Sequence, residues 1–233
     1  MKQLAYILFS CLYSVVYWGQ TAAEDFKKIS SAFGNNQNIS MNIEYNVYEN
    51  HAAKISIDNQ KGFYRRNGSS ICNRLMNYES LTAEGKTLIV DESERKITIG
   101  KASKVPMPGP ASIDIEKSIS LFGKITLSDI SRNEKCYHLT LKKNAAAFYE
   151  KIEVYFNPQT YTVSRMVFYY SRAVDFSGGT KAQKPRVELQ FNDVVTKPRF
   201  SDDEFSFSRF VVKKGKLYQP SEKYKGYKVI EQS

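Results

Sequence analysis

Residues 149–170, "YEKIEVYFNPQTYTVSRMVFYY", decide the fold. Two apolar, aromatic-rich runs flank "NPQT", residues 157–160, whose composition is that of a β-turn, so the stretch predicts an antiparallel hairpin. Its second strand is apolar on both faces, so both must be covered. One face carries Val163, Val167 and Tyr169, and the other carries Met166, Phe168 and Tyr170.

Alternation of apolar and polar residues continues on both sides of this hairpin. It is clearest in "ISMNIEYNV", residues 39–47, which predicts a half-buried strand. "AKISI" and "GFYRR" (53–57 and 62–66) are interpreted as one strand, bulged near Asn59. The other predicted strands are "SSICNRLMNYESL" (69–81), "KTLIV" (86–90), "RKITI" (95–99), "KITLSDI" (124–130), "KCYHLTLKK" (135–143) and "RVELQFNDV" (186–194).

Two segments have helical spacing instead. In "EDFKKISSAF", residues 24–33, Phe26, Ile29 and Phe33 share one helical face. In "ASIDIEKSISLFG", residues 111–123, that face is formed by Ile115, Ile119 and Phe122. The order of elements predicts an α+β fold, in which a curved antiparallel sheet of about ten strands has amphipathic helices over its concave face.

A cluster of charge in "GKTLIVDESERKITIG", residues 85–100, raises the question of a carboxylate active site. Asp91, Glu92 and Glu94 fall between two alternating strands, at the expected tip of a hairpin. Charged residues at such tips stay in water, whereas a catalytic carboxylate needs a cleft and a perturbed environment. We interpret the cluster as a turn.

The N-terminus has the pattern of a secretory signal peptide, residues 1–23. Lys2 precedes an uncharged apolar run, and small residues follow it, with cleavage expected after Gly19 or after Ala23. Cys11 lies inside the apolar run rather than at its end, which argues against a lipid anchor there. The expected mature protein is a periplasmic monomer of one domain, residues 24–233.

Charge and residue types exclude several classes of function. The chain of 233 residues has a net charge of +10, or +9 without Lys2, but the positive residues are scattered apart from a basic C-terminal tail, and an exported protein rarely meets nucleic acid. The two histidines, His51 and His138, have no partners at metal-ligand spacing, so neither a metal nor a cofactor is expected. A hydrolase using Ser177 with His138 is a minor alternative.

Cys72 and Cys136 are the cysteines outside the signal segment, and each falls in a predicted strand. Export permits a disulfide between them, but two strand cysteines form a bridge only when their Cα atoms are close. The sequence leaves two alternatives, one disulfide or two buried free thiols.

The order of these pieces resembles the periplasmic lipoprotein carriers, the LolA family, with LolB and related half-barrels as relatives. The matching segments are "KGFYRRNG", "LTAEGKTLIVDESERKITIG", "HLTLKKNAAAFYEKIEVYFNPQTYTVSRMVFYY" and "FNDVVTKPRFSDDEFSF". Together with the N-terminal helix they cover nearly all of the expected mature chain. The chain departs from the family at Asn67, where a proline is usual, in a following strand without tryptophan, and in its basic ending.

This resemblance implies an open half-barrel that shields the acyl chains of outer-membrane lipoproteins and has no enzymatic activity. It implies an inner-membrane release complex and an outer-membrane acceptor as further partners. Ile115, Ile119 and Phe122 would line a lid, Met166 and Phe168 the sheet face, and Arg66, with Arg65 beside it, would help to hold the lid closed. The alternative is an accessory envelope or secretion protein that uses the same fold for protein contact, through the basic tail.

Overall fold

The computed structural model of the chain describes residues 22–33, 36–102, 119–142, 148–175, 182–215 and 217–232. The chain folds into two compact units, and each is described by itself. The first comprises residues 1–35, 48–55 and 108–187, and the second comprises residues 36–47, 56–107 and 188–233. None of the helices in the described ranges has the length and apolarity needed to cross a membrane.

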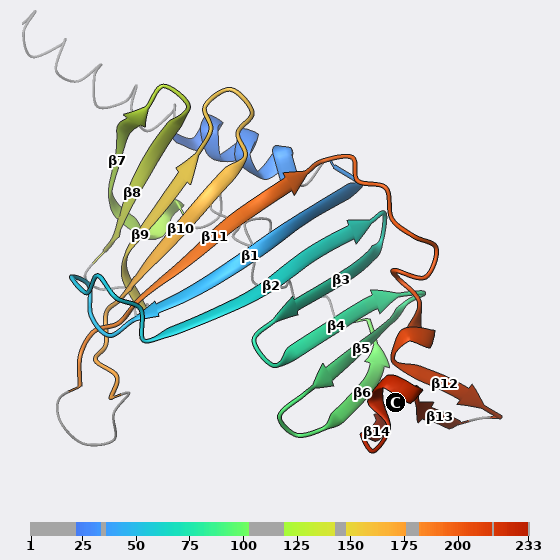
Figure 1. Cartoon of the computed structure of the whole chain (residues 1–233). Helices are drawn as coiled ribbons and strands as arrows, with labels where there is room; N and C mark the ends of the chain where they lie inside the picture. The colour runs from blue at the N-terminus through green and yellow to red at the C-terminus, as the bar shows by residue number, and fades with distance from the viewer. Residues whose placement is uncertain are drawn as a thin grey trace, which may run out of the picture. The chain divides into compact units, whose positions relative to one another are not determined.

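The first unit contains a helix and four strands in the antiparallel order β10-β9-β8-β7. The strands are β7 (Phe122–Ser131), β8 (Glu134–Leu141), β9 (Tyr149–Phe156) and β10 (Val163–Tyr170) (Figure 1). The predicted hairpin is therefore confirmed. Its turn is closed by the Asn157 side chain, whose Oδ1 accepts hydrogen bonds from the backbone N–H groups of Gln159 and Thr160.

The first predicted helix is confirmed at residues 22–33, blue in Figure 1. Phe26, Ile29 and Phe33 are each at most 2% exposed, as their shared face requires. Asp25 accepts a hydrogen bond from the Tyr137 hydroxyl at 2.7 Å, and Lys28 donates to the Tyr161 hydroxyl at 3.1 Å. These contacts fix the helix against one end of the first unit's sheet.

The second predicted helix is in part wrong. Residues 111–118 lie outside the described residues, a short 3-10 helix, η1, spans Ile119–Leu121, and Phe122 begins strand β7. Backbone pairing with β8 explains this difference: Lys142 N donates to Leu121 O at 3.0 Å, and Phe122 pairs with Leu141. The helical spacing of Phe122 does not outweigh its place in the sheet.

The second unit is a larger open sheet with strands in the order β14-β6-β5-β4-β3-β2-β1-β11. Its strands are β1 (Asn38–Tyr48), β2 (Asp58–Asn67), β3 (Ser70–Leu75), β4 (Tyr78–Ala83), β5 (Lys86–Asp91), β6 (Lys96–Lys101), β11 (Arg186–Val195) and β14 (Lys228–Glu231). Neighbours from β1 to β6 are antiparallel, whereas β14 runs parallel to β6. Apart from this strand, the predicted open antiparallel α+β class is confirmed.

Two strand predictions between residues 53 and 81 are wrong. "AKISI" is a loop, in which Ile55 is 83% exposed, and β2 begins only at Asp58. The predicted bulge near Asn59 is not found, because the register of β2 with β1 is regular there. "SSICNRLMNYESL" is two strands, β3 and β4, because the chain turns at Met76, whose φ is +54°. No glycine or proline marks that turn, so the sequence hides it.

The C-terminal segment is folded rather than a free tail. It forms η2 (Phe207–Arg209), β12 (Val211–Lys214), β13 (Leu217–Pro220), η3 (Glu222–Tyr224) and β14, red in Figure 1. Phe210, Val211 and Tyr224 join a hydrophobic core with the sheet residues Cys72, Leu81, Ala83, Leu88, Val90, Ile97 and Ile99. Removal of residues 213–233 would therefore take away core packing, including that of Tyr224.

Candidate functional site

One face of the first unit's sheet is apolar across adjacent strands. Cross-strand pairing places Met166 of β10 opposite Val154 of β9, and Phe168 opposite Ile152. Directly paired residues share a face, so the structure brings the predicted Met166 and Phe168 together on it. Both are buried, at 1% and 9% exposed.

Aromatic rings continue this apolar face toward the helix at 22–33. Phe26 of the helix lies 4.7 Å, centroid to centroid, from Tyr137 of β8, and Tyr137 stacks on Phe156 at 5.5 Å. Phe156 in turn stacks on Tyr161 at 6.1 Å. Burial, reinforced by the hydrogen bond to Asp25, raises the pKa of Tyr137 far above its usual value, so its hydroxyl stays a donor.

A second aromatic cluster lies at the other end of β9 and β10. Tyr149 contacts Phe168 at 5.1 Å and Tyr170 at 4.9 Å between ring centroids, and the neighbouring Phe148 is 67% exposed. From Phe156 to Tyr149 the strand spans about 23 Å, at about 3.3 Å per residue. The apolar face thus runs from the helix to an aromatic end that reaches solvent.

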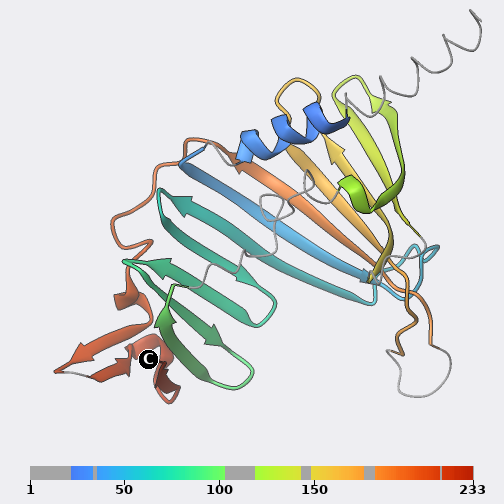
Figure 2. The ribbon, with the colours of Figure 1, turned by 180° about the vertical axis from the view of Figure 1, so that it is seen from behind.

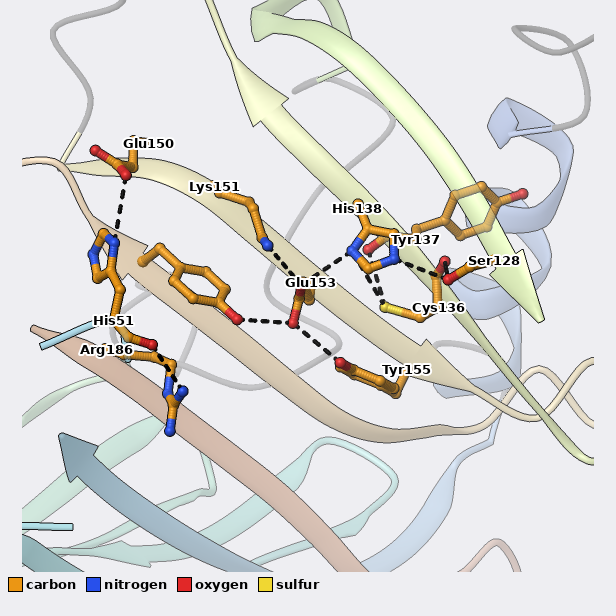
Figure 3. A network of polar contacts seen from close by, with 11 residues as sticks. His51, Ser128, Cys136, Tyr137, His138, Glu150, Lys151, Glu153, Tyr155 and Arg186 are labelled. Atoms are coloured by element: carbon orange, nitrogen blue, oxygen red, sulfur yellow. Dashed lines mark hydrogen bonds and ion pairs between the residues drawn. The ribbon is translucent and has the colours of Figure 1, made fainter. Parts of the chain in front are cut away.

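The opposite face of the same strands carries a polar network centred on Glu153 of β9 (Figure 3). This carboxylate is 6% exposed. It accepts hydrogen bonds from Lys151 Nζ at 2.8 Å, Tyr169 OH at 3.0 Å and Tyr155 OH at 3.1 Å, and lies 3.0 Å from His138 Nδ1. One buried charge therefore connects β8, β9 and β10.

The charge of Glu153 is well satisfied. Burial by itself raises the pKa of this carboxyl. The hydrogen bond and the charge of Lys151, together with the hydrogen bonds from Tyr169 and Tyr155, outweigh burial, so the pKa lies below its usual value. Burial, together with Glu153, raises the pKa of Tyr169 to about 12. The carboxylate is ionised and the tyrosines are neutral donors at neutral pH.

His138 also connects this network to β7. Its Nε2 lies 2.9 Å from Ser128 Oγ, so Ser128, His138 and Glu153 are connected in the order found in serine hydrolases. A hydrolase also needs donors for an oxyanion beside the serine. Ser128 sits within the regular β7–β8 pairing, opposite Cys136, rather than on a turn that would present such donors. We assign the network a role in holding the strands together, and Ser177 lies outside the described residues.

The second histidine, His51, holds a loop against the aromatic end of the sheet. His51 Nε2 lies 3.1 Å from Tyr170 O, and its Nδ1 is 3.5 Å from Glu150 (Figure 3). Arg186 donates to the backbone carbonyls of His51 and Ala53, at 3.0 Å each. Within the described ranges, no three His, Cys, Asp or Glu side chains are grouped so that they could hold a metal ion.

No protein-family model and no curated protein matches this sequence. Solved structures do. The lipoprotein LppX of Mycobacterium tuberculosis is 8% identical, over 78% of this chain and 99% of that one, with a TM-score of 0.45. A LolA superfamily protein from Nitrosomonas europaea is 11% identical, over 78% of this chain and 94% of that one, with a TM-score of 0.33.

The chain is similar to a putative outer membrane lipoprotein-sorting protein domain from Vibrio parahaemolyticus, at 9% identity over 81% of this chain and 97% of that one, with a TM-score of 0.37. It is also similar to the complex of MucA and MucB from Pseudomonas aeruginosa, at 13% identity over 86% of this chain and 63% of that one, with a TM-score of 0.45. At such identities the likeness concerns the fold alone. The roles of residues in this chain have to come from its own geometry.

The residues expected at a LolA-like ligand site have different outcomes. Ile115 lies outside the described residues, and Ile119 is in η1. Phe122 is 9% exposed and pairs with Leu141 of β8. Because Leu141 and the buried Leu139 are two residues apart on one strand, Phe122 belongs with the apolar face that carries Met166 and Phe168. Of the aromatic cluster around Tyr149, the predicted site contains Phe168 but not Tyr149 or Tyr170, although the tyrosine and phenylalanine content of β9 and β10 signals them.

The two arginines expected to hold the lid make contacts within the second unit. Arg65 pairs with Glu204 and lies over the Phe63 ring at 4.5 Å, and Arg66 donates to Asn36 O. Arg65 thereby ties the C-terminal segment to β2. Gating by either arginine stays a prediction.

The acidic cluster at 91–94 is a turn, as expected, but it is less solvated than a hairpin tip suggests. Asp91 is 7% exposed and ends β5. Its Oδ1 accepts hydrogen bonds from Ser93 N, Ser93 Oγ and Glu94 N, which lower the pKa of the Asp91 carboxyl. Glu92 pairs with Arg74 at 2.8 Å. The hydrogen bonds of Asp91 stabilise the turn, and Glu92 connects it to β3.

The cysteines are free thiols in the structure, both buried, and each belongs to a different unit. Cys72 Sγ accepts a hydrogen bond from Arg209 at 3.6 Å, and Cys136 Sγ donates to Tyr137 O at 3.6 Å. The alternative of a disulfide is therefore not the one found. Burial, with the nearby charge of Glu153, raises the pKa of the Cys136 thiol to about 11, so it is protonated and unreactive at neutral pH.

Proposed function

We propose that this protein is an exported, non-enzymatic binder of acylated molecules, with outer-membrane lipoproteins as its cargo in the periplasm. The observation that carries the proposal is the apolar face of the first unit, which extends from the helix contact at Tyr137 to the aromatic end at Tyr149. Met166 and Phe168 lie along it. Acyl chains need only such a surface, without a charged or metal-binding group.

The energetics explain why such a binder is needed. An acyl chain of about sixteen carbons exposed to water costs about 12 kcal/mol, at about 0.8 kcal/mol for each methylene. A lipoprotein therefore does not cross an aqueous compartment unescorted. A carrier must cover that surface and still release it at the receiving membrane.

Binding on this face requires movement. Met166 and Val154 are at most 1% exposed, so an acyl chain reaches them only when the groups that cover them give way. The aromatic end is the place where the face already meets solvent, because Tyr149 and Tyr170 are only half-buried there. We place the entrance of the ligand at Tyr149, Phe168 and Tyr170.

A pair of adjacent substitutions tests this assignment. Phe168→Ser removes an aromatic ring from the proposed ligand face, and Val167→Ser makes a comparable change on the opposite face, where Val167 is 4% exposed. We expect Phe168→Ser to weaken the binding of a fluorescent fatty acid at least tenfold, the equivalent of about 1.4 kcal/mol, and Val167→Ser to leave it within about twofold.

Unfolding curves of both variants provide the control, because each removes buried apolar area. An equal loss of fatty-acid binding in the two variants would show that lower stability causes the loss. It would count against the assignment of the Phe168 face as the ligand site. Wild-type affinity in folded Phe168→Ser protein would reject the assignment.

A further inference from the structure

The two strands β12 and β13 form a small sheet separate from the larger one. In Figures 1 and 2 this ribbon projects away from the strands β4 to β6 of its unit. Its register pairs Val212 with Gln219 and Lys214 with Leu217, so these four side chains share one face. Val212 is 47% exposed and Leu217 is 67% exposed, and Lys214 is exposed between them.

The other face of this ribbon is fixed to its unit. Val211 is 3% exposed in the core. The Tyr218 hydroxyl accepts a hydrogen bond from Lys86 Nζ at 3.3 Å, and Tyr218 N donates to Glu231 at 3.4 Å. The face with Val212 and Leu217 is therefore turned outward by these contacts.

The segment that carries this outward face is strongly basic. From Val211 to Glu231 the sequence has six lysines and two glutamates, a net charge of 6 − 2 = +4. Lys213, Lys223 and Lys228 are exposed, whereas Glu222 is 3.8 Å from Lys225 and Glu231 accepts from Tyr218. Exposed aliphatic side chains surrounded by lysines are the composition of segments that lie at a membrane surface.

We propose that the outward face of β12–β13 docks on the surface of an anionic lipid bilayer. Val212 and Leu217 enter the boundary of the acyl region, and Lys214 beside them contacts lipid headgroups. Two apolar side chains on a narrow ribbon offer far less area than the roughly 800 Å² that each partner buries in a stable protein interface. A bilayer has no such requirement, because inserted side chains and nearby lysines add up individually. This inference concerns a different unit from the acyl-binding face and goes beyond the proposed function.

Vesicle binding tests the proposal with the purified full-length mature protein. We expect sedimentation with vesicles that combine phosphatidylcholine and phosphatidylglycerol, weakening as salt is raised, and little with phosphatidylcholine alone. Lys214→Gln should weaken binding to the anionic vesicles about fivefold, and Leu217→Ser about fivefold as well. The matched controls are Lys124→Gln and Ile130→Ser, at exposed positions of the first unit, and they should change the affinity less than twofold.

Three outcomes would overturn docking on lipid. The first is equal binding to neutral and anionic vesicles, and the second is an equal loss of binding in the β12–β13 variants and the control variants. The third is binding of polyglutamate that depends on β12–β13, without binding to vesicles, which would indicate an acidic protein as the partner instead. Phe168→Ser separates this proposal from the acyl-binding function. That variant should keep its affinity for the vesicles even when it no longer binds the fluorescent fatty acid.

Discussion

Arg209→Met should lower the free energy of unfolding by about 3 kcal/mol or more, because it leaves the buried carboxylate of Glu79 with too little compensation. Glu79 is 2% exposed, and its Oε1 lies 3.2 Å from Arg209 Nη2. Its remaining cation, Arg74, is 3.9 Å away. Arg209 also donates to Glu204 O at 2.6 Å, so the substitution loosens the C-terminal segment that completes the core. Urea unfolding measures the change.

The second substitution of a double-mutant cycle identifies the cause. Adding Glu79→Gln to Arg209→Met should recover part of the loss, because the buried charge is then removed together with its partner. Lys225→Met is the control, since Lys225 and Glu222 form an exposed pair that should contribute less than about 1 kcal/mol. A loss below about 1 kcal/mol in Arg209→Met would contradict the importance of this contact.

Gly62→Ala should cost nearly as much, about 3 kcal/mol, for a steric reason. Gly62 lies in β2, and a Cβ atom there would fall 2.0 Å from Arg74 O and 3.3 Å from Leu75 Cα. Both are backbone atoms of β3, so no side-chain rotation relieves the overlap. We expect a lower urea midpoint for unfolding.

Gly100→Ala is the matched control for this prediction. A Cβ atom at Gly100 in β6 would meet only the Gln232 side chain, at 3.7 Å, which is ordinary van der Waals contact. Its effect should stay within about 0.5 kcal/mol. Equal stability of the two alanine variants would show that β2 and β3 are less closely apposed than the structure has them.

The parts of the fold that follow from local periodicity could be predicted from the sequence. Phe26, Ile29 and Phe33 signal one helical face, and residues 39–47 alternate as a strand with one buried face must. The hairpin at 149–170 is marked by its turn residues as well as by its strands. These signals are local, and so they do not depend on what the rest of the chain does.

Other parts depend on contacts between residues far apart in the sequence. The parallel pairing of β14 with β6 joins Val229 to Ile97, and no local pattern indicates it. The turn at Met76 lacks a glycine, and Phe122 leaves its helical pattern because β8 pairs with it. The lysines of the C-terminal segment indicate a free basic tail, but the structure places Tyr224 of this segment in the core. Its core contacts are with residues far away in the sequence, which no local pattern reveals.

The candidate site could be predicted in part. Met166 and Phe168 follow from alternation along one strand, which also places them on a common face. The Glu153 network does not follow from the sequence, because it joins residues of four strands through side chains that individually look like a solvated polar face. The network lies on the face opposite Met166 and Phe168, where Glu153 pairs with the buried Val167.

Native mass spectrometry tests the proposed acyl-binding function most directly, on the mature protein purified from the periplasm without detergent and with lipid extraction in parallel. The account predicts a population with added mass that matches an acyl lipid or a lipopeptide, and uptake of an added fatty acid by the remainder. A mass of the protein alone, together with no uptake of the added fatty acid, would contradict it and identify the apolar face as ordinary core.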